Sequence, residues 1–182
     1  MKKNFKIYLD LDGVLANFDK LILELFELYY KQKITNVRLL SYNVKQEIIR
    51  KHNARGGKFY QELEVYEDAF HLVQSCLSIE NTEVIILTAL GYTDAENTYK
   101  QKQAWINKNF PGLKINVVSS GAQKAIFSNE NTFLIDDRKS AVDAFNKINR
   151  GGKGLIFNNQ NEHEWVNMAE YVKDIIEGAD YE

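Results

Sequence analysis

The sequence predicts an α/β fold: a doubly wound, Rossmann-like parallel sheet with a small helical cap inserted after the first strand. Two observations predict it. Short apolar segments alternate with segments of helical periodicity along most of the chain, which is typical of parallel strands covered by helices on both faces. The interval between the first two apolar segments is the exception, because it holds three helical patterns where a crossover between strands needs one.

Each expected strand is a short apolar run with polar or glycine-containing flanks. The five runs are Lys6–Leu9, Glu83–Leu87, Ile115–Val118, Thr132–Ile135 and Gly154–Phe157. Helical periodicity fills the later intervals, over Thr93–Asn109, Ser140–Ile148 and Glu162–Ile176. Strand and helix therefore alternate through the second half of the chain, as a doubly wound sheet requires.

The long first interval is predicted to form the cap. Its three helical patterns lie near Lys20–Lys31, Val44–His52 and Tyr66–Leu77. We therefore expect a core domain of residues 1–17 and 80–182 and an α-helical cap of residues 18–79. Such a cap hangs over the carboxyl end of the first strand, the edge at which ligands bind in open α/β sheets.

Composition limits the classes of function. The 182 residues are 45% hydrophobic and 26% charged, and the net charge of −2 offers no broad basic surface, so a nucleic-acid partner is not expected. The single cysteine, Cys76, cannot form an intramolecular disulfide, and proteins of the reducing cytoplasm rarely contain disulfides. Asp10 and Asp12 interrupt the first apolar run, and no run is long enough to span a membrane. We expect a cytoplasmic protein without a membrane segment.

Two pairs of aspartates follow expected strands. Asp10 and Asp12 end the first strand, and Asp136 and Asp137 end the fourth. Alternate residues of a strand point to the same side, so Asp10 and Asp12 converge, and parallel strands would bring the second pair to the same edge. Carboxylates so close together raise each other's pKa unless a cation lies between them. An all-oxygen set without nearby His or Cys favours Mg²⁺ over zinc.

A hydroxyl and a lysine accompany these acids. Thr88 ends the second expected strand, and Lys124 lies shortly before the second acidic pair. Either residue alone would be read as structural or solvated. Together with Mg²⁺ and a carboxylate nucleophile they have the composition of a phosphate pocket.

The four motifs, in this order, resemble those of the haloacid dehalogenase (HAD) superfamily of phosphohydrolases. DLDGV (residues 10–14) is similar to the first motif, Thr88 to the second, Lys124 to the third and Asp136-Asp137 to the fourth. Within the superfamily the chain most resembles the cytosolic and mitochondrial 5′(3′)-deoxyribonucleotidases. The similar stretches are DLDGVLANF, GKFYQELEVYEDA, ILTA, QKQAWINKNFPGL and FLIDDR.

The resemblance implies roles for the motif residues. Asp10 would attack phosphorus and form an aspartyl-phosphate, and Asp12 would protonate the leaving group and then activate water. Asp10, the backbone carbonyl of Asp12 and one of Asp136 and Asp137 would hold Mg²⁺, with Asp136 favoured as the direct ligand. Thr88, Ala89 and Lys124 are assigned to the phosphate group. Ala89 stands where those enzymes usually carry serine, so this chain lacks one hydroxyl that could donate a hydrogen bond to the phosphate.

Substrate choice is expected to lie in the cap. Phe18, Phe59 and Tyr60 are candidates to stack on a base, and Arg55 or Lys58 to meet a phosphate or a base edge. The alternative for each aromatic residue is packing inside the cap. Glu64–Asp68 replaces a proline-rich segment of the similar enzymes, which leaves the nucleotide preference open.

The predicted function is therefore a Mg²⁺-dependent phosphomonoesterase acting on (deoxy)nucleoside monophosphates, a 5′-nucleotidase of the HAD type. One alternative is a HAD phosphatase for another small phosphate, such as a sugar phosphate, or for a nucleic-acid 3′-phosphate end. A second alternative is a nucleotide-binding module without catalysis, although a binder has no need of the acid at Asp12. The resemblance also implies pairing of chains into homodimers.

Overall fold

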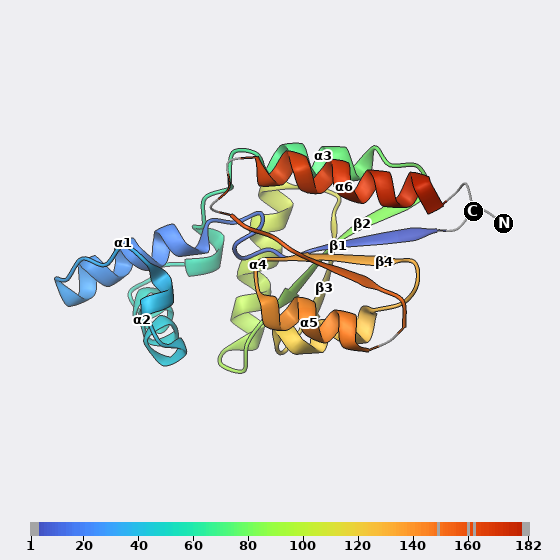
Figure 1. The fold of residues 1–182 in the computed structure, drawn as a ribbon. Coiled ribbons are helices and arrows are strands. Elements are labelled where there is room, and N and C mark those ends of the chain that lie inside the picture. Colours follow the sequence, from blue (N-terminus) through green and yellow to red (C-terminus); the bar gives the residue numbers. More distant parts are fainter. Residues whose placement is uncertain (1–3, 149, 160, 162, 180–182) are drawn as a thin grey trace.

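A computed structural model describes residues 4–148, 150–159, 161 and 163–179. Its centre is a sheet of five parallel strands in the order β3-β2-β1-β4-β5 (Figure 1). The strands are β1 (Phe5–Leu9), β2 (Thr82–Ala89), β3 (Lys114–Val118), β4 (Thr132–Asp136) and β5 (Lys153–Ile156). Each expected strand is present, so the predicted α/β class and its parallel sheet are confirmed.

The strand β1 is the middle strand of the sheet, and its pairing on both sides determines which residues meet at the carboxyl edge. Leu9 pairs with Ile86 of β2 on one side and with Ile135 of β4 on the other. This register brings the carboxyl ends of the three strands to one edge. Asp10 and Asp136 each follow directly after the last residues of these pairs, so the predicted convergence of the acidic residues is confirmed.

Side chains of β1 alternate between two apolar layers. Ile7 and Leu9 are fully buried in the larger cluster, which also holds side chains of the cap and of the helices on one face. Tyr8 points to the smaller cluster with Leu87 and Phe145 on the opposite face. Burial on both faces explains why Ile7, Tyr8 and Leu9 are consecutive apolar residues, whereas Lys6, near the start of the strand, is exposed.

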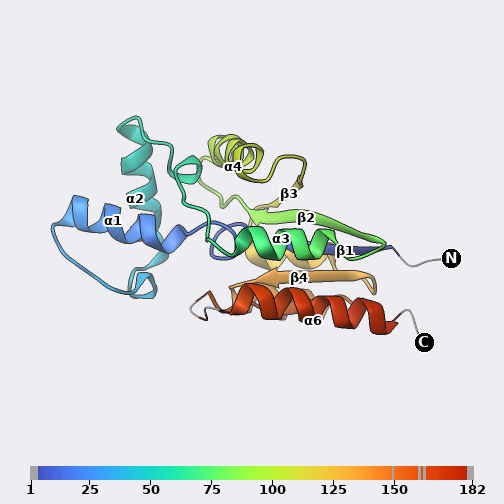
Figure 2. The ribbon, with the colours of Figure 1, turned by 90° about the horizontal axis from the view of Figure 1, so that it is seen from above.

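Helices cover both faces of the sheet. Figures 1 and 2 show α3 (Ala69–Leu77) and α6 (Glu164–Ala179) side by side on one face, and Figure 1 shows α5 (Lys139–Lys147) on the other. α4 (Ala95–Asn109) follows β2, and a 3₁₀ segment, η3 (Gly121–Phe127), precedes β4. None of the helices in the described ranges is long and apolar enough to cross a membrane. The predicted start of the last helix, residue 162, lies outside the described residues.

The cap projects beyond the carboxyl edge of the sheet (Figures 1 and 2). It consists of α1 (Phe18–Tyr30), η1 (Val37–Leu39), α2 (Tyr42–Ala54) and η2 (Phe59–Gln61). Both of its α-helices start at a side chain that accepts a hydrogen bond from a free backbone N–H, Asn17 for α1 and Ser41 for α2.

The third helix of the long interval is not part of the cap. Residues 66–77 were expected to belong to it, but α3 packs against β2 and α6, with Leu72 and Cys76 fully buried in the main apolar cluster. The cap is consequently smaller than residues 18–79. The sequence pattern shows an apolar helix face but not which layer that face meets, and this caused the difference.

The chain enters and leaves the cap through neighbouring segments. Ala16 forms a bridge with Val65, and the Asn17 N–H donates to the carbonyl of Glu64 at 2.8 Å. An ion pair between Lys20 Nζ and Glu64 Oε2 at 2.7 Å lies next to this bridge. We call the two paired segments the neck of the cap.

Candidate active site

Asp10 is held at the end of β1 with one oxygen occupied. The N–H of Leu11 donates to Asp10 Oδ1 at 2.8 Å, and Lys124 Nζ lies 2.8 Å from the same oxygen. The side chain is 4% exposed. Within the described residues Asp10 Oδ2 receives no hydrogen bond, so the geometry leaves one carboxylate oxygen free to act on a substrate.

Lys124 connects the two acidic strand ends. Its Nζ also lies 2.6 Å from Asp136 Oδ2, and the N–H of Arg138 donates to Asp136 Oδ1 at 2.8 Å. Burial alone would lower the pKa of Lys124, but the charges of Asp10 and Asp136 outweigh it and raise the pKa. The lysine is therefore a fixed positive charge, and both oxygens of Asp136 are already engaged.

Asp137 completes an acidic cluster with Asp10 and Asp136. One carboxylate oxygen from each of the three residues lies within 4.8 Å of the others. Burial, reinforced by the charges of Asp10 and Asp136, raises the pKa of Asp137 to about 8, and burial and Asp10 raise that of Asp136 to about 6. Asp137 Oδ1 is buried without a hydrogen-bond partner among the described residues. A hard cation fits this all-oxygen set, since it would satisfy the unpartnered oxygen and offset the crowded charge.

Gly13 leaves room for Asp137. Its backbone has φ +87°, and a Cβ at this position would lie 2.7 Å from Asp137 Cγ. Only glycine combines this left-handed conformation with so close an approach. Asn159 Nδ2 donates to the carbonyl of Gly13 at 3.1 Å, which ties the turn after β1 to the segment after β5.

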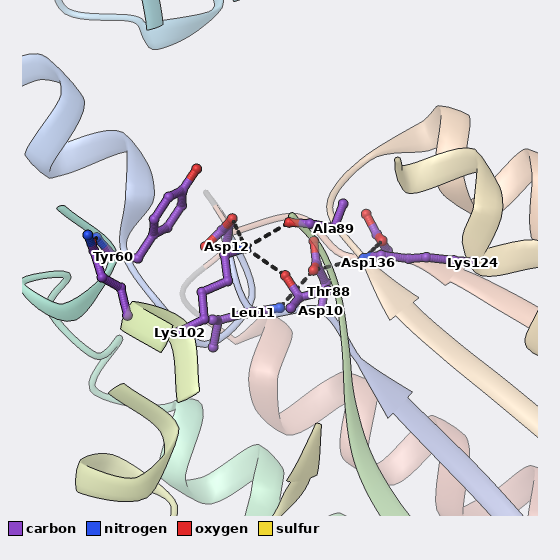
Figure 3. A network of polar contacts seen from close by, with 10 residues as sticks. Asp10, Leu11, Asp12, Tyr60, Thr88, Ala89, Lys102, Lys124 and Asp136 are labelled. Carbon is purple, nitrogen blue, oxygen red and sulfur yellow. Dashed lines mark hydrogen bonds and ion pairs between the residues drawn. The ribbon is translucent and has the colours of Figure 1, made fainter. Parts of the chain in front are cut away.

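Asp12 lies beside Asp10 and is bonded to a lysine that sequence reasoning missed. Lys102 of α4 donates from Nζ to Asp12 Oδ2 at 2.7 Å (Figure 3). Burial raises the pKa of Asp12, Lys102 opposes this rise, and the charge of Asp10 adds to it. Asp12 Oδ1 is buried and has no hydrogen-bond partner within the described ranges.

The same lysine holds the end of β2. Lys102 Nζ donates to Thr88 Oγ1 at 2.8 Å and to the carbonyl of Ala89 at 3.0 Å (Figure 3). Thr88 is fully buried. The structure thus brings Asp10, Asp12, Thr88 and Lys124 together at one edge, as their places in the sequence predict.

A cavity of about 590 Å³ lies between the cap and this edge. The core contributes three acidic residues, Asp10, Asp12 and Asp137, together with Thr88, Lys124 and the Ser119–Gly121 turn. The cap contributes Phe18, Asp19, Val37, Arg38, Tyr42, Lys45, Gln46 and Tyr60. Aromatic and cationic side chains therefore surround a cavity whose floor carries the acids.

Three of the five cap residues predicted to contact substrate do not line this cavity. Phe59 is fully buried and packs edge-on against Phe18 with ring centroids 5.4 Å apart. Arg55 stacks over the ring of Tyr29 at 4.8 Å, and Lys58 is exposed elsewhere on the cap. For Phe59 the alternative interpretation, packing within the cap, describes the structure.

Other cavity residues were not predicted. Tyr42 and Tyr92 are exposed aromatic side chains at the cavity, with exposed fractions of 52% and 76%. Arg38 and Lys45 come from the cap and Arg138 from the core. Their sequence neighbourhoods are ordinary polar loops and helix faces, so only the position of the cap over the sheet reveals them.

The sequence comparisons identify one matching family. Residues 4–176 match the family described as 5′ nucleotidase, deoxy (pyrimidine), cytosolic type C protein. A comparison with curated proteins gives no match.

Solved structures of low sequence identity share the fold. A haloacid dehalogenase-like family hydrolase from Xanthomonas campestris superposes with a TM-score of 0.61 at 14% identity, covering 98% of this chain and 94% of that one. A hydrolase from Streptococcus pneumoniae gives 0.56 at 14% identity, covering 94% and 99%. A HAD family enzyme from Bacteroides thetaiotaomicron, in complex with magnesium and inorganic phosphate, gives 0.50 at 15% identity, covering 88% and 97%.

Proposed function

Since the chain belongs to the family of 5′ nucleotidase, deoxy (pyrimidine), cytosolic type C proteins, and so is a Mg²⁺-dependent phosphatase of the HAD type, we propose that it hydrolyses nucleoside monophosphates at the site described above. The observation that carries the proposal is the placement of Asp10, Asp12, Thr88 and Lys124 at the floor of one cavity.

Asp10 is the proposed nucleophile. Its Oδ1 is held by Leu11 and Lys124, so Oδ2 is the atom that would attack phosphorus in line and form the aspartyl-phosphate. A nucleophile fixed by two hydrogen bonds loses little freedom on reaching the transition state, which is how positioning contributes to rate.

Asp12 is the proposed general acid and base. In the first half-reaction it would give a proton to the leaving alkoxide, and in the second it would take a proton from water. An acid must hold its proton near neutral pH, and burial of Asp12 raises its pKa in that direction. A positioned acid or base contributes about 10²- to 10⁴-fold in rate.

The proposed Mg²⁺ ligands are carboxylate oxygens of Asp10 and Asp137 and the backbone carbonyl of Asp12. We prefer Asp137 to Asp136 because Asp136 already bonds Lys124 and Arg138, whereas Asp137 Oδ1 has no partner among the described residues. When bound, the cation offsets the repulsion between an anionic nucleophile and an anionic phosphate. Thr88, Lys124 and the turn at Ser119 and Ser120 would hold the phosphoryl oxygens.

The cavity supports a nucleotide as substrate. Phe18, Tyr42, Tyr60 and Tyr92 give it apolar surface on which a base and sugar can pack. Its volume of about 590 Å³ lies within the 300–1,000 Å³ that is typical of small-molecule sites. We therefore assign the base to the cap side and the phosphate to the sheet edge.

The test is a panel of phosphate monoesters assayed with purified protein and Mg²⁺. Turnover confined to nucleoside monophosphates supports the proposal, whereas turnover of sugar phosphates alone contradicts it. Asp10→Asn keeps the size of the side chain and should abolish turnover. The variant should keep the fold and still unfold cooperatively on heating. Full activity of that variant would show that another residue attacks phosphorus.

A further inference from the structure

Lys102 has every donor of its side chain engaged. An ammonium group has three N–H donors, and Lys102 Nζ has three acceptors: Asp12 Oδ2 at 2.7 Å, Thr88 Oγ1 at 2.8 Å and the carbonyl of Ala89 at 3.0 Å. The side chain has no exposed surface. The ammonium group cannot turn without losing a bond, so its position relative to Asp12 is fixed.

Packing alone does not account for a lysine here. Burying a charge is costly unless the charge is fully paired, and replacing such a pair by apolar residues is often neutral or stabilising. Trp105 and Ile106, on the same buried side of α4, show that this helix face accepts apolar residues. The ammonium group of Lys102 is therefore explained by the hydrogen bonds that it donates, not by the packing of its side chain.

Those contacts give the two oxygens of Asp12 different roles. Oδ2 accepts from Lys102, whereas Oδ1 is buried and receives no hydrogen bond from the described residues. With Oδ2 occupied, Oδ1 is the oxygen available to a substrate. An unpartnered buried oxygen is costly in the resting protein and gains its partner when substrate or water arrives.

We propose that Lys102 is a positioning residue of the phosphatase reaction, which fixes Asp12 through Oδ2 so that Oδ1 exchanges the proton. This inference rests on the proposed function. When Asp10 Oδ2 bonds to phosphorus and the bond to the leaving oxygen breaks, the proton passes from Asp12 Oδ1 to that oxygen. When water attacks the aspartyl-phosphate, its proton returns to Oδ1 as the bond between Asp10 and phosphorus breaks.

The cap contributes to this arrangement. The ring of Tyr60 covers Lys102, with Nζ 4.8 Å from the ring centroid. The Tyr60 N–H donates to Oε1 of Gln101, the residue beside Lys102, at 2.9 Å. An aromatic face over an ammonium group is attractive and excludes water. The base of the cap and the proton-transferring aspartate are thereby joined through one lysine.

The experiment compares two substrates that differ in their need for an acid. A nucleoside monophosphate leaves as a basic alkoxide and needs a proton, whereas p-nitrophenyl phosphate leaves as a stable phenolate and needs almost none. We measure kcat/KM, which reports the first half-reaction, for the wild type, Lys102→Met and Lys102→Gln. Lys100→Met is the matched control, because Lys100 lies on the same helix but is exposed and forms its ion pair with Glu96 of that helix.

We expect Lys102→Met to lower kcat/KM by about 100-fold for the nucleotide, within the range of acid catalysis, and by less than about 5-fold for p-nitrophenyl phosphate. Lys100→Met should change neither. Equal losses on both substrates would overturn the inference, since a merely structural defect does not depend on the leaving group. If Lys102→Met does not fold, the same comparison is made with Lys102→Gln, and the same outcomes apply.

A double variant gives a second decision. With Asp12→Asn already in place, adding Lys102→Met should cost less than about 3-fold, because contacting residues that act as a unit are not additive. A full additional loss would mean that Lys102 acts independently of Asp12 and would overturn the inference.

The two proposals fail differently. Wild-type protein that hydrolyses p-nitrophenyl phosphate and a sugar phosphate but no nucleotide contradicts only the proposed substrate, and the sugar phosphate then replaces the nucleotide in the comparison. Protein that hydrolyses no phosphate monoester in Mg²⁺ contradicts both.

Discussion

A Cβ built on Gly13 would lie 2.7 Å from Cγ of Asp137, closer than any side chain tolerates. The turn after the first strand and the acid after the fourth are therefore packed against each other with no room for a methyl group. Gly13 and Asp137 form one unit, in which the glycine defines where the carboxylate can sit.

Replacing Gly13 by alanine should remove activity and Mg²⁺ binding, because the new methyl group displaces the carboxylate of Asp137. We expect activity to fall at least about 100-fold, since displacements of the order of 1 Å in a site cost that much. Gly112→Ala is the control, because Gly112 has φ +93° and no other part of the described chain lies within 4 Å of its Cβ position. It should lose about 1 kcal/mol of stability through backbone strain and keep its activity. Equal activity in the two variants would show that the contact with Asp137 is unimportant.

Asp136→Asn and Asp137→Asn should differ in kind. Asp137→Asn should raise the Mg²⁺ concentration needed for half-maximal activity by about 10- to 100-fold and leave thermal unfolding without Mg²⁺ unchanged or improved. Asp136→Asn removes one of the two charge partners of buried Lys124, leaving only Asp10 of the two, and should lower the free energy of unfolding by about 3 kcal/mol. Titration of activity with Mg²⁺ and thermal melts of both variants check this. The reverse pattern would make Asp136 the direct ligand.

Stability should depend on pH and Mg²⁺ together. Burial raises the pKa of Asp137 in the folded, metal-free protein to about 8, against 3.8 for an aspartate in water. Between these two pKa values, the folded state holds a proton on Asp137 that the unfolded state has lost. The metal-free protein therefore loses stability from this group as pH rises from about 4 to about 8. Mg²⁺ needs the ionised form, so the rise in melting temperature on adding Mg²⁺ should be larger at about pH 8 than at about pH 6.

The comparison is a pair of melting curves, with Mg²⁺ and with a chelator, at each pH. In Asp137→Asn the dependence of the Mg²⁺ effect on pH should flatten. An effect of Mg²⁺ that shrinks as pH rises would contradict the assignment of this titration to the metal site.

Tyr42 should contribute to nucleotide binding rather than to chemistry. It is an exposed cap residue that lines the cavity, and its hydroxyl lies 3.5 Å from the Cβ position of Gly91 on the core side. Tyr42→Ala should raise KM for a nucleoside monophosphate by about 10-fold, as loss of one stacking contact does, with kcat nearly unchanged. Tyr171→Ala serves as control, because Tyr171 has a similar exposed fraction of 54% but lies on α6, away from this cavity. A fall in kcat at unchanged KM would place Tyr42 in the catalytic step.

The floor of the site could be predicted because each of its residues lies at the end of a strand that is itself recognisable in the sequence. Asp10, Thr88 and Asp136 each follow or end an apolar strand, and parallel strands bring such ends to one edge whatever the details of packing. Lys102 could not be placed in the same way. Its contacts to Asp12 and Thr88 depend on how α4 is oriented against β2, which strand order does not determine. The sequence nevertheless held one indication that Lys102 is buried. It lies three residues before Trp105, so the two side chains share the buried face of α4.

The cap was predicted to exist but not in its details. Apolar spacing identifies α1 and α2, whereas the inward or outward direction of an aromatic residue depends on tertiary packing. Phe59 is buried inside the cap for this reason, while Tyr42, which nothing local distinguishes, lies at the cavity. The helix α3 shows the same limit at the level of a whole element.

The neck of the cap has a consequence for how this protein can change over evolutionary time. Because Asn17 and Glu64 are hydrogen-bonded neighbours, the segment between them leaves the core and returns to nearly the same point. Such an insertion can be lengthened, shortened or exchanged with little disturbance to the strands, since its ends need no new closure. The catalytic floor and most of the cap can thus vary separately, and grafting another helical segment between these two residues, with Tyr60 kept over Lys102, would test whether the cap sets specificity.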